Sequence, residues 1–204
     1  RRVAEALADA GRVETLSYPF VGPAELDALG LPPGDERRRT VRLVNPLAET
    51  QPELRTSLLL TLGQTARRNV SRGHTDLGVY EIGLVTRADG AAAAAPTGGV
   101  YPGDDVVEKI KAAVPTQPRH VAGVLTGRRE RAGWWGPGRM ADHTDAIELA
   151  RYVARVVGVD VELRAVEQMP WHPGRCAEVL VDGEVVGHAG ELHPAVVQAL
   201  DLPA

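Results

Sequence analysis

Apolar residues recur at helical spacing in several stretches of this sequence. The clearest stretch is 54–70, where Leu54, Leu58 and Leu62 lie four residues apart and therefore share one face of a helix. Arginines gather toward its end, where positive charge interacts favourably with the helix dipole. The helices predicted from this spacing, and from the Pro and Gly residues that bound them, are 2–10, 24–29, 54–70, 104–114, 144–157 and 194–200.

Shorter apolar or alternating runs between these stretches are typical of strands. They are 13–18, 41–44, 79–85, 120–126, 161–166, 177–181 and 185–189. Asp182-Gly183 separates the last two runs, and this dipeptide favours a two-residue hairpin turn. Because hairpins mix with helices without strict alternation, the pattern predicts an α+β fold with a mostly antiparallel sheet flanked by helices.

Three segments follow neither periodicity. Residues 31–39 are rich in Pro and Arg, and residues 127–138 combine Gly, Arg and Trp, so both are predicted to be loops. The Ala and Gly run at 88–99 has too little apolar bulk to pack, which predicts a flexible insertion over 87–103. Around this insertion, residues 1–204 are predicted to form a single domain.

Composition narrows the class of protein. A chain of 204 residues with 44% hydrophobic and 25% charged content can bury a substantial core. The net charge of −4 provides no broad positive field for nucleic acid, and a single cysteine, Cys176, excludes an internal disulfide framework. No stretch approaches the roughly 20 apolar residues of a membrane span, so we expect a cytoplasmic protein without a membrane partner. Since the chain opens on a predicted helix without an initiator Met, we also expect a fragment of a longer subunit.

Four groups of motifs follow one another along almost the full chain. They are Asn45-Pro46-Leu47 with Leu54-Arg55-Thr56-Ser57-Leu58-Leu59, Asn69-Val70-Ser71-Arg72-Gly73 with Tyr80-Glu81-Ile82-Gly83, His120-Val121-Ala122-Gly123-Val124-Leu125-Thr126-Gly127, and His172-Pro173-Gly174-Arg175 with Gly187-His188-Ala189-Gly190-Glu191-Leu192-His193-Pro194. In this order and spacing the chain resembles the catalytic-like module of bacterial phenylalanyl-tRNA synthetase beta subunits.

The resemblance implies the fold of class II synthetase catalytic domains, in a subunit that joins an alpha subunit in a tetramer of two alpha and two beta chains. In that family, catalysis belongs to the alpha subunit. The resemblance therefore implies a structural module that packs against the alpha subunit, while ATP, Mg²⁺ and tRNA are bound by the whole enzyme. Faces that pack against an absent partner could allow the isolated fragment to self-associate.

Class II enzymes carry an arginine on a Gly-rich segment near the end of the catalytic domain, because the charge on a reacting phosphate needs preorganised cations. The corresponding segment here, 187–193, has no arginine and carries Glu191 instead, which would repel a phosphate. We therefore predict no catalytic, cofactor-binding or metal-binding residues in the chain. Gly174, Gly187 and Gly190 would permit close backbone approach or a positive φ, and Arg175 could bind a carboxylate or a carbonyl.

An alternative interpretation is a stand-alone hydrolase or metal enzyme built on the C-terminal residues His172, Cys176, His188 and His193. Their spacing fits no zinc finger, ribbon or His-Glu-x-x-His pattern, which favours hydrogen-bonded histidines instead. Cys176 lies beside Arg175, which could lower its pKa, but no paired base has a recognisable place. A half-buried strand cysteine is the favoured interpretation.

Two further sets of residues have alternative interpretations. Arg55 is predicted to open the clearest helix, either as an interface or substrate-proximal contact or in an ion pair with Glu49, Glu53 or Glu81. Arginines at the end of that helix, Arg67, Arg68 and Arg72, are interpreted as a solvated cap, with contact to the tRNA backbone as the alternative.

Three tryptophans stand in predicted loops, where large apolar groups need something to cover them. They are Trp134, Trp135 and Trp171. Each is a candidate for docking against the alpha subunit or a neighbouring domain of the beta subunit, or for folding onto its own domain. Near them in the motifs, His172, Arg175 and Glu191 are candidate interface or structural residues.

Overall fold

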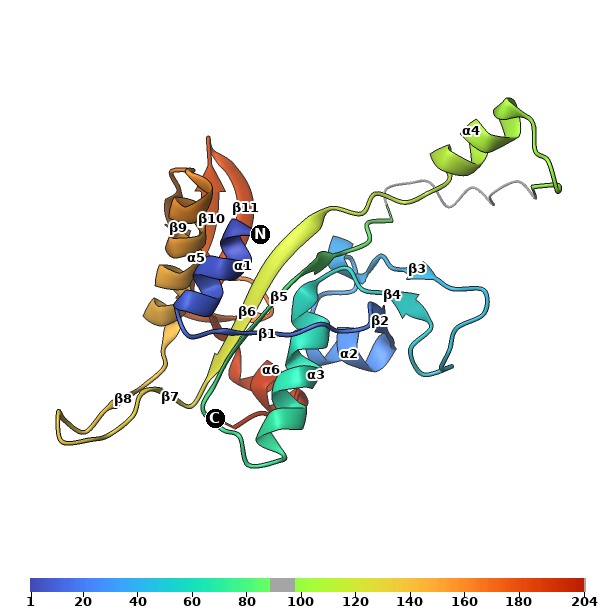
Figure 1. Ribbon diagram of the computed structural model, residues 1–204. Coiled ribbons are helices and arrows are strands. Elements are labelled where there is room, and N and C mark those ends of the chain that lie inside the picture. Colours follow the sequence, from blue (N-terminus) through green and yellow to red (C-terminus); the bar gives the residue numbers. More distant parts are fainter. Residues whose placement is uncertain (89–97, 204) are drawn as a thin grey trace.

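A computed structural model describes residues 1–88 and 98–203 of the chain as helices packed on small, mostly antiparallel sheets (Figure 1). The α-helices of this part are α1 (Arg2–Asp9), α2 (Pro23–Ala28), α3 (Leu58–Val70), α4 (Asp104–Ala112), α5 (His143–Val157) and α6 (Pro194–Ala199), with a 3-10 turn η1 (Glu36–Arg38). The strands are β1 (Val13–Glu14), β2 (Phe20–Val21), β3 (Val41–Arg42), β4 (Glu53–Leu54), β5 (Leu77–Leu84), β6 (Arg119–Thr126), β7 (Arg128–Glu130), β8 (Arg139–Met140), β9 (Glu162–Ala165), β10 (Trp171–Val181) and β11 (Glu184–Leu192).

The strands form three sheets and a separate hairpin. Sheet orders are β1-β5-β6, β2-β4-β3 and β11-β10-β9, and β7 pairs with β8. Strand β1 runs parallel to β5, and all the other pairs are antiparallel. The mostly antiparallel α+β architecture is therefore the one that the sequence pattern predicts.

Helix α3 lies between two apolar clusters. Ser57 caps its start by accepting a hydrogen bond from the Leu59 N–H, and Leu58 and Leu62 then pack toward β5, with Val79 and Val85. Leu60, on another face, packs toward α2 and α6. The second cluster consists of Val21, Leu26, Leu29, Leu31, Leu60, Val196 and Leu200. Because two faces of α3 are apolar, the helix joins the N-terminal and C-terminal parts of the fold.

The C-terminal sheet is built around the predicted hairpin. Asp182 and Gly183 have φ angles of 51° and 84°, the left-handed conformation that a two-residue turn of this type requires. The turn sets the pairing of Glu184 with Val181 at the start of β11. Helix α5 packs against β10 and β11, and α1 packs against α5 (Figure 1).

Several predicted elements have different bounds in the structure. The predicted helix 54–70 begins only at Leu58, because Leu54 pairs in β4 and Ser57 provides the cap. The predicted strand 13–18 is paired only at Val13–Glu14. Strand β10 begins at Trp171, so Trp171 and His172 lie in a strand and not in a loop. Part of the predicted loop 127–138 forms the β7–β8 hairpin.

Most of the predicted insertion at 87–103 lies outside the described residues, which resume at residue 98. Helix α4 follows on an arm between β5 and β6 that extends away from the rest of the fold (Figure 1). In the described part of the chain, no helix has the length and apolar character needed to cross a membrane.

Candidate functional site

The Gly-rich segment lies in β11, directly before helix α6, as the resemblance implies. A Cβ added to Gly190 would collide with the backbone of Arg175 and Cys176 on β10, so the two strands approach too closely there for any side chain. Gly187, on the same strand, has open space around it. Only Gly190 is thus required by the strand pairing.

Arg175 and Glu191 form an ion pair across these two strands. One guanidinium nitrogen, Nη1 of Arg175, donates to both carboxylate oxygens of Glu191 at 3.0 Å. Both side chains are partly exposed, so we expect the pair to contribute at most about 1 kcal/mol to stability. The Glu191 carboxylate neutralises the guanidinium charge of Arg175. A phosphate placed here would therefore have to compete with Glu191 for that arginine.

Arg55 lies inside the fold, where its side chain is 4% exposed. Its Nη1 is 2.7 Å from Glu81 Oε1 and donates to Thr61 Oγ1 at 2.8 Å, while its Nε donates to the Leu84 carbonyl at 3.1 Å. Of the three carboxylates considered from the sequence, Glu81 is therefore its partner. Neither Glu81 oxygen accepts a hydrogen bond of good geometry from the described residues, so the guanidinium charge is its main compensation.

The backbone of Arg55 also joins two parts of the fold. Its N–H donates to the Pro19 carbonyl at 2.8 Å, before β2, and its own carbonyl accepts from the Thr86 N–H at 2.9 Å, after β5. Arg55 thus connects the sheet of β2, β3 and β4 to the strand that carries Glu81. Its burial and its bonds within the fold favour a structural interpretation of Arg55 over a substrate or interface contact.

Two of the C-terminal histidines, His172 and His193, contact backbone atoms within two residues along the chain. His172 Nδ1 is 2.6 Å from the Pro173 carbonyl, and His193 Nδ1 accepts from the Ala195 N–H at 3.1 Å as the cap of α6. Burial raises the pKa of the Cys176 thiol to about 11, with Glu178 adding to the shift, which is the opposite of thiolate activation. No metal-binding group of three or more such side chains occurs in residues 1–88 and 98–203. The hydrolase or metal-enzyme alternative has no support in this geometry.

Trp171 and His188 stack inside the C-terminal sheet, with ring centroids 6.3 Å apart. Trp171 is 9% exposed and pairs with Leu192 across β10 and β11, so this tryptophan folds onto its own domain. His188 also contacts the Gln168 amide, and its Nε2 lies 3.9 Å from Glu178. Burial lowers the pKa of His188, Glu178 opposes the shift and Arg37 adds to it.

This lowered pKa of His188 predicts a loss of stability in mild acid. The unfolded histidine takes up a proton near pH 6.5, and the folded one does so only at a lower pH, so this contribution to stability is complete above about pH 6.5 and is lost as the pH drops toward the folded pKa. We expect the melting temperature to fall as the pH is lowered below about 6.5, and to fall less in His188→Asn. The exposed His74→Asn is the control, and equal pH profiles for all three proteins would contradict the prediction.

Trp134 and Trp135 lie at the tip of the β7–β8 hairpin. Their exposed fractions are 94% and 65%, and their rings meet edge to face at 5.8 Å. The hairpin is attached at its base through Asp145 at the start of α5, which accepts two hydrogen bonds of 2.7 Å from Arg139. The bonds from Arg139 lower the pKa of Asp145 despite its burial. This anchor was not predicted from the sequence, although an Asp in the first helical turn is a recognisable signal.

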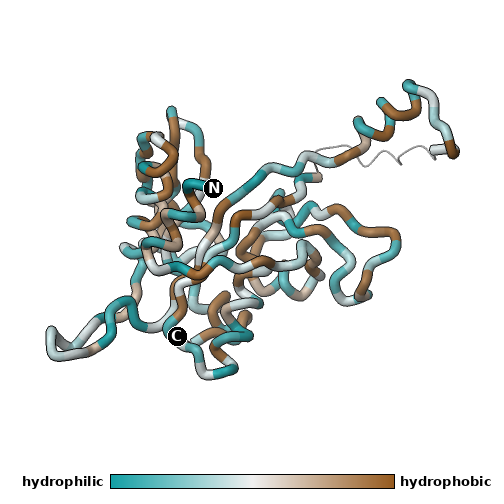
Figure 2. Tube along the Cα trace, in the orientation of Figure 1, coloured by the Kyte–Doolittle hydropathy of each residue, from teal (hydrophilic) through white to brown (hydrophobic). Residues whose placement is uncertain are grey.

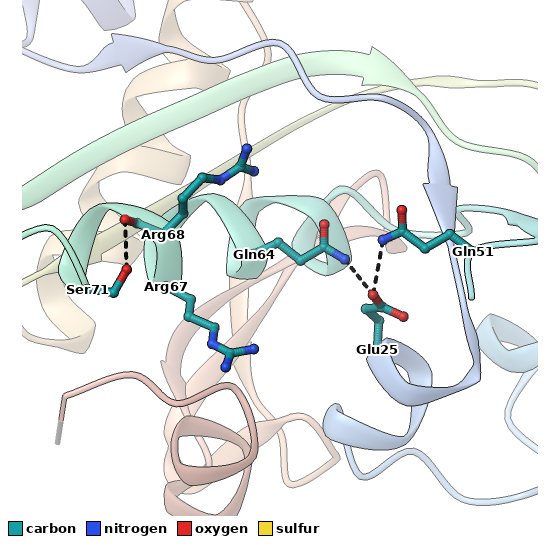
Figure 3. A pocket seen from close by; sticks show the side chains of 6 residues that line it. All are labelled: Glu25, Gln51, Gln64, Arg67, Arg68 and Ser71. Atoms are coloured by element: carbon teal, nitrogen blue, oxygen red, sulfur yellow. Dashed lines mark hydrogen bonds between the residues drawn. The ribbon is translucent and has the colours of Figure 1, made fainter. Parts of the chain in front are cut away.

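A shallow surface depression of about 450 Å³ lies over α2 and α3 (Figure 3). Glu25 Oε1 accepts from Gln64 at 2.7 Å and from Gln51 at 3.2 Å. Arg67 lies 3.4 Å from Asp201, and the Ser71 hydroxyl donates a hydrogen bond to the Arg68 carbonyl. Glu25 is therefore bonded to amides and Ser71 to a backbone carbonyl, so these two side chains are not paired as base and nucleophile.

Comparison with solved structures identifies the fold as that of class II aminoacyl-tRNA synthetases. A crystal structure of pyrrolysyl-tRNA synthetase from Desulfitobacterium hafniense matches 99% of this chain and 61% of its own, with a TM-score of 0.65 and 14% sequence identity. A structure of PylSc, a pyrrolysyl-tRNA synthetase of the same organism, gives a TM-score of 0.63 at 12% identity over 99% of this chain and 60% of its own. At these identities the likeness establishes the fold alone.

The sequence defines a narrower group. Residues 1–204 match the family model of the phenylalanyl tRNA synthetase beta chain CLM domain, and the chain belongs to that family. It is 51% identical to the phenylalanine–tRNA ligase beta subunit of Streptomyces avermitilis and 47% identical to that of Mycolicibacterium paratuberculosis, over 100% of this chain and 25% of each relative. The chain therefore spans about a quarter of the length of these relatives, and the resemblance seen in its motifs is confirmed.

Proposed function

We propose that this chain is a non-catalytic structural module of a phenylalanyl-tRNA synthetase beta subunit, which packs against the alpha subunit in a tetramer of two alpha and two beta chains. In this role, residues 1–204 act as one domain that helps to position the partner's active site. ATP and Mg²⁺ would be bound by the whole enzyme, and tRNA would be attached to phenylalanine there. We place this assembly in the cytoplasm.

The observation that carries the proposal is that two arginines of the synthetase-like motifs, Arg55 and Arg175, are paired with carboxylates of the same chain. Arg175 is paired with Glu191 at 3.0 Å, and Arg55 is buried against Glu81 at 2.7 Å. Activation of an amino acid needs free cationic groups on the nucleotide phosphates. A class II fold in which Arg55 and Arg175 are bound by its own carboxylates is better suited to a structural role.

Large exposed apolar side chains support the second half of the proposal, docking to a partner. Leu16 and Tyr18 are 93% and 82% exposed in the segment before β2, and Val44 and Leu47 are 101% and 87% exposed between β3 and β4. Figure 2 shows apolar positions on this outer β3–β4 loop. Covering such side chains with a partner stabilises the complex. The same exposed surface could also let the isolated chain self-associate.

The proposal predicts that a charge in these segments weakens assembly with the alpha subunit. We expect Leu16→Asp and Leu47→Asp to raise the dissociation constant about tenfold or more, measured by light scattering and co-purification. Both side chains are exposed, so folding should be unaffected. Val100→Asp, at a residue that is 89% exposed on the arm before α4, is the matched control.

Two results would contradict the proposed function. One is assembly of both Asp variants as tightly as the unmodified chain. The other is pyrophosphate exchange by the purified chain alone when it is mixed with ATP, Mg²⁺ and phenylalanine, since that activity would require a nucleotide site within these residues.

A further inference from the structure

The β7–β8 hairpin displays two indole rings at a tight turn. Gly133 and Gly136 exchange backbone hydrogen bonds of 2.9 Å and 3.0 Å, which makes Trp134 and Trp135 the two residues of the turn itself. The hairpin projects from the body of the fold, and its strands β7 and β8 are exposed throughout (Figure 1). Two-residue turns favour Gly, Asn and Asp, so turn geometry gives no reason for tryptophan here.

The two rings have different roles at the tip. The Trp135 ring folds back over Gly133, where an added Cβ would lie 2.6 Å from the ring, and its Nε1 donates to the Arg131 carbonyl at 3.2 Å. Trp135 is therefore held in place by the hairpin. Trp134 packs against it edge to face and leaves 94% of its surface in solvent. The turn thus presents one free indole on a fixed support.

Positive charge is concentrated in the hairpin that carries this ring, although the chain is acidic overall. Residues 128–140 contain four arginines and one glutamate, whereas the whole chain has a net charge of −4. Arg129 and Arg139 are paired with Asp145, at 3.4 Å and 2.7 Å. Within residues 1–88 and 98–203, Arg128 and Arg131 have no ion-pair partner, so their charge is available to a ligand.

We propose that the β7–β8 hairpin binds unpaired nucleotides of an RNA, with a base stacked on Trp134 and phosphates bound by Arg131 and Arg128. An exposed aromatic face beside free guanidinium groups is the combination that recognises single-stranded nucleic acid. Apart from the two indoles, the only large apolar side chain in the hairpin is Met140. A protein interface needs about 800 Å² from each partner, which so narrow a tip does not offer by itself.

Fluorescence anisotropy of a labelled oligouridylate with the purified chain tests this proposal. We expect Trp134→Ala to weaken binding about tenfold, because one base loses its stacking platform. Arg131→Gln should weaken binding and reduce the salt slope of log K by about 0.7, the value for one phosphate contact on a single strand. A duplex RNA of equal length should bind more weakly than the single strand, since its bases are already stacked.

Two control variants separate this surface from others. Tyr101→Ala removes an aromatic side chain that is 94% exposed on the arm before α4, and Arg72→Gln removes an exposed arginine at the end of α3. Both should bind the oligouridylate like the unmodified chain. The proposal is overturned if the chain does not bind the single strand, if the duplex binds equally well, or if Arg72→Gln weakens binding more than Arg131→Gln. It is also overturned if Trp134→Ala leaves RNA binding intact and impairs only assembly with the alpha subunit.

Discussion

Replacing Arg55 by Met is expected to lower the free energy of unfolding by about 3–5 kcal/mol, one of the largest effects of any single substitution in this chain. Glu81 would remain as a charged side chain that is 1% exposed, without the guanidinium that lies 2.7 Å away. The bonds from Arg55 to Thr61 and to the Leu84 carbonyl would be lost as well. Urea unfolding followed by circular dichroism measures the change.

The double variant Arg55→Met with Glu81→Leu should recover most of this loss, because a buried ion pair replaced by apolar side chains of similar volume is often neutral. Arg151→Met is the matched control. Arg151 lies 2.9 Å from Glu148, but both side chains are about half exposed, so the change should be within about 0.5 kcal/mol. A loss below about 1 kcal/mol for Arg55→Met would show that water reaches this pair.

The importance of this pair could be predicted from the sequence only in part. The Leu-Arg-Thr-Ser motif identified Arg55, and simple charge pairing identified three candidate carboxylates. The choice of Glu81 depends on β4 and β5 meeting near Arg55, and nothing in local periodicity specifies which sheets meet. The same limit explains the helix start: Leu54 continues the four-residue spacing of α3, yet its pairing with Phe20 and Val41 places it in a strand.

Local chemistry predicted other features well. The Asp182-Gly183 turn, the arginines in the last turn of α3 and the mostly antiparallel α+β class all follow from short-range rules. Burial of loop tryptophans could not be decided locally. Trp171 is buried because β10 begins six residues earlier than predicted, whereas Trp134 and Trp135 are exposed at the tip of a hairpin that is bonded to α5 near its base.

Gly190→Val is expected to destabilise the protein by about 3 kcal/mol, since overpacking a well-packed site typically has an effect of this size and here it acts on backbone. A Cβ at Gly190 would overlap the Arg175 carbonyl and the Cys176 Cα, which cannot move aside as a flexible side chain could. Strands β10 and β11 would have to separate at the register pair Cys176 and Gly190. Thermal unfolding followed by circular dichroism gives the measurement.

Gly187→Val provides an unusually close control, because it places the same substitution in the same strand where no atom lies within 4 Å of the added Cβ. Its effect should stay within about 0.5 kcal/mol, or stabilise slightly through the strand preference of valine. Equal losses for the two variants would mean that the Gly-rich segment is not held by close strand contact. A large difference would show that Gly190 serves the packing of this sheet, as we propose for a Gly-rich segment that carries Glu191 and no arginine.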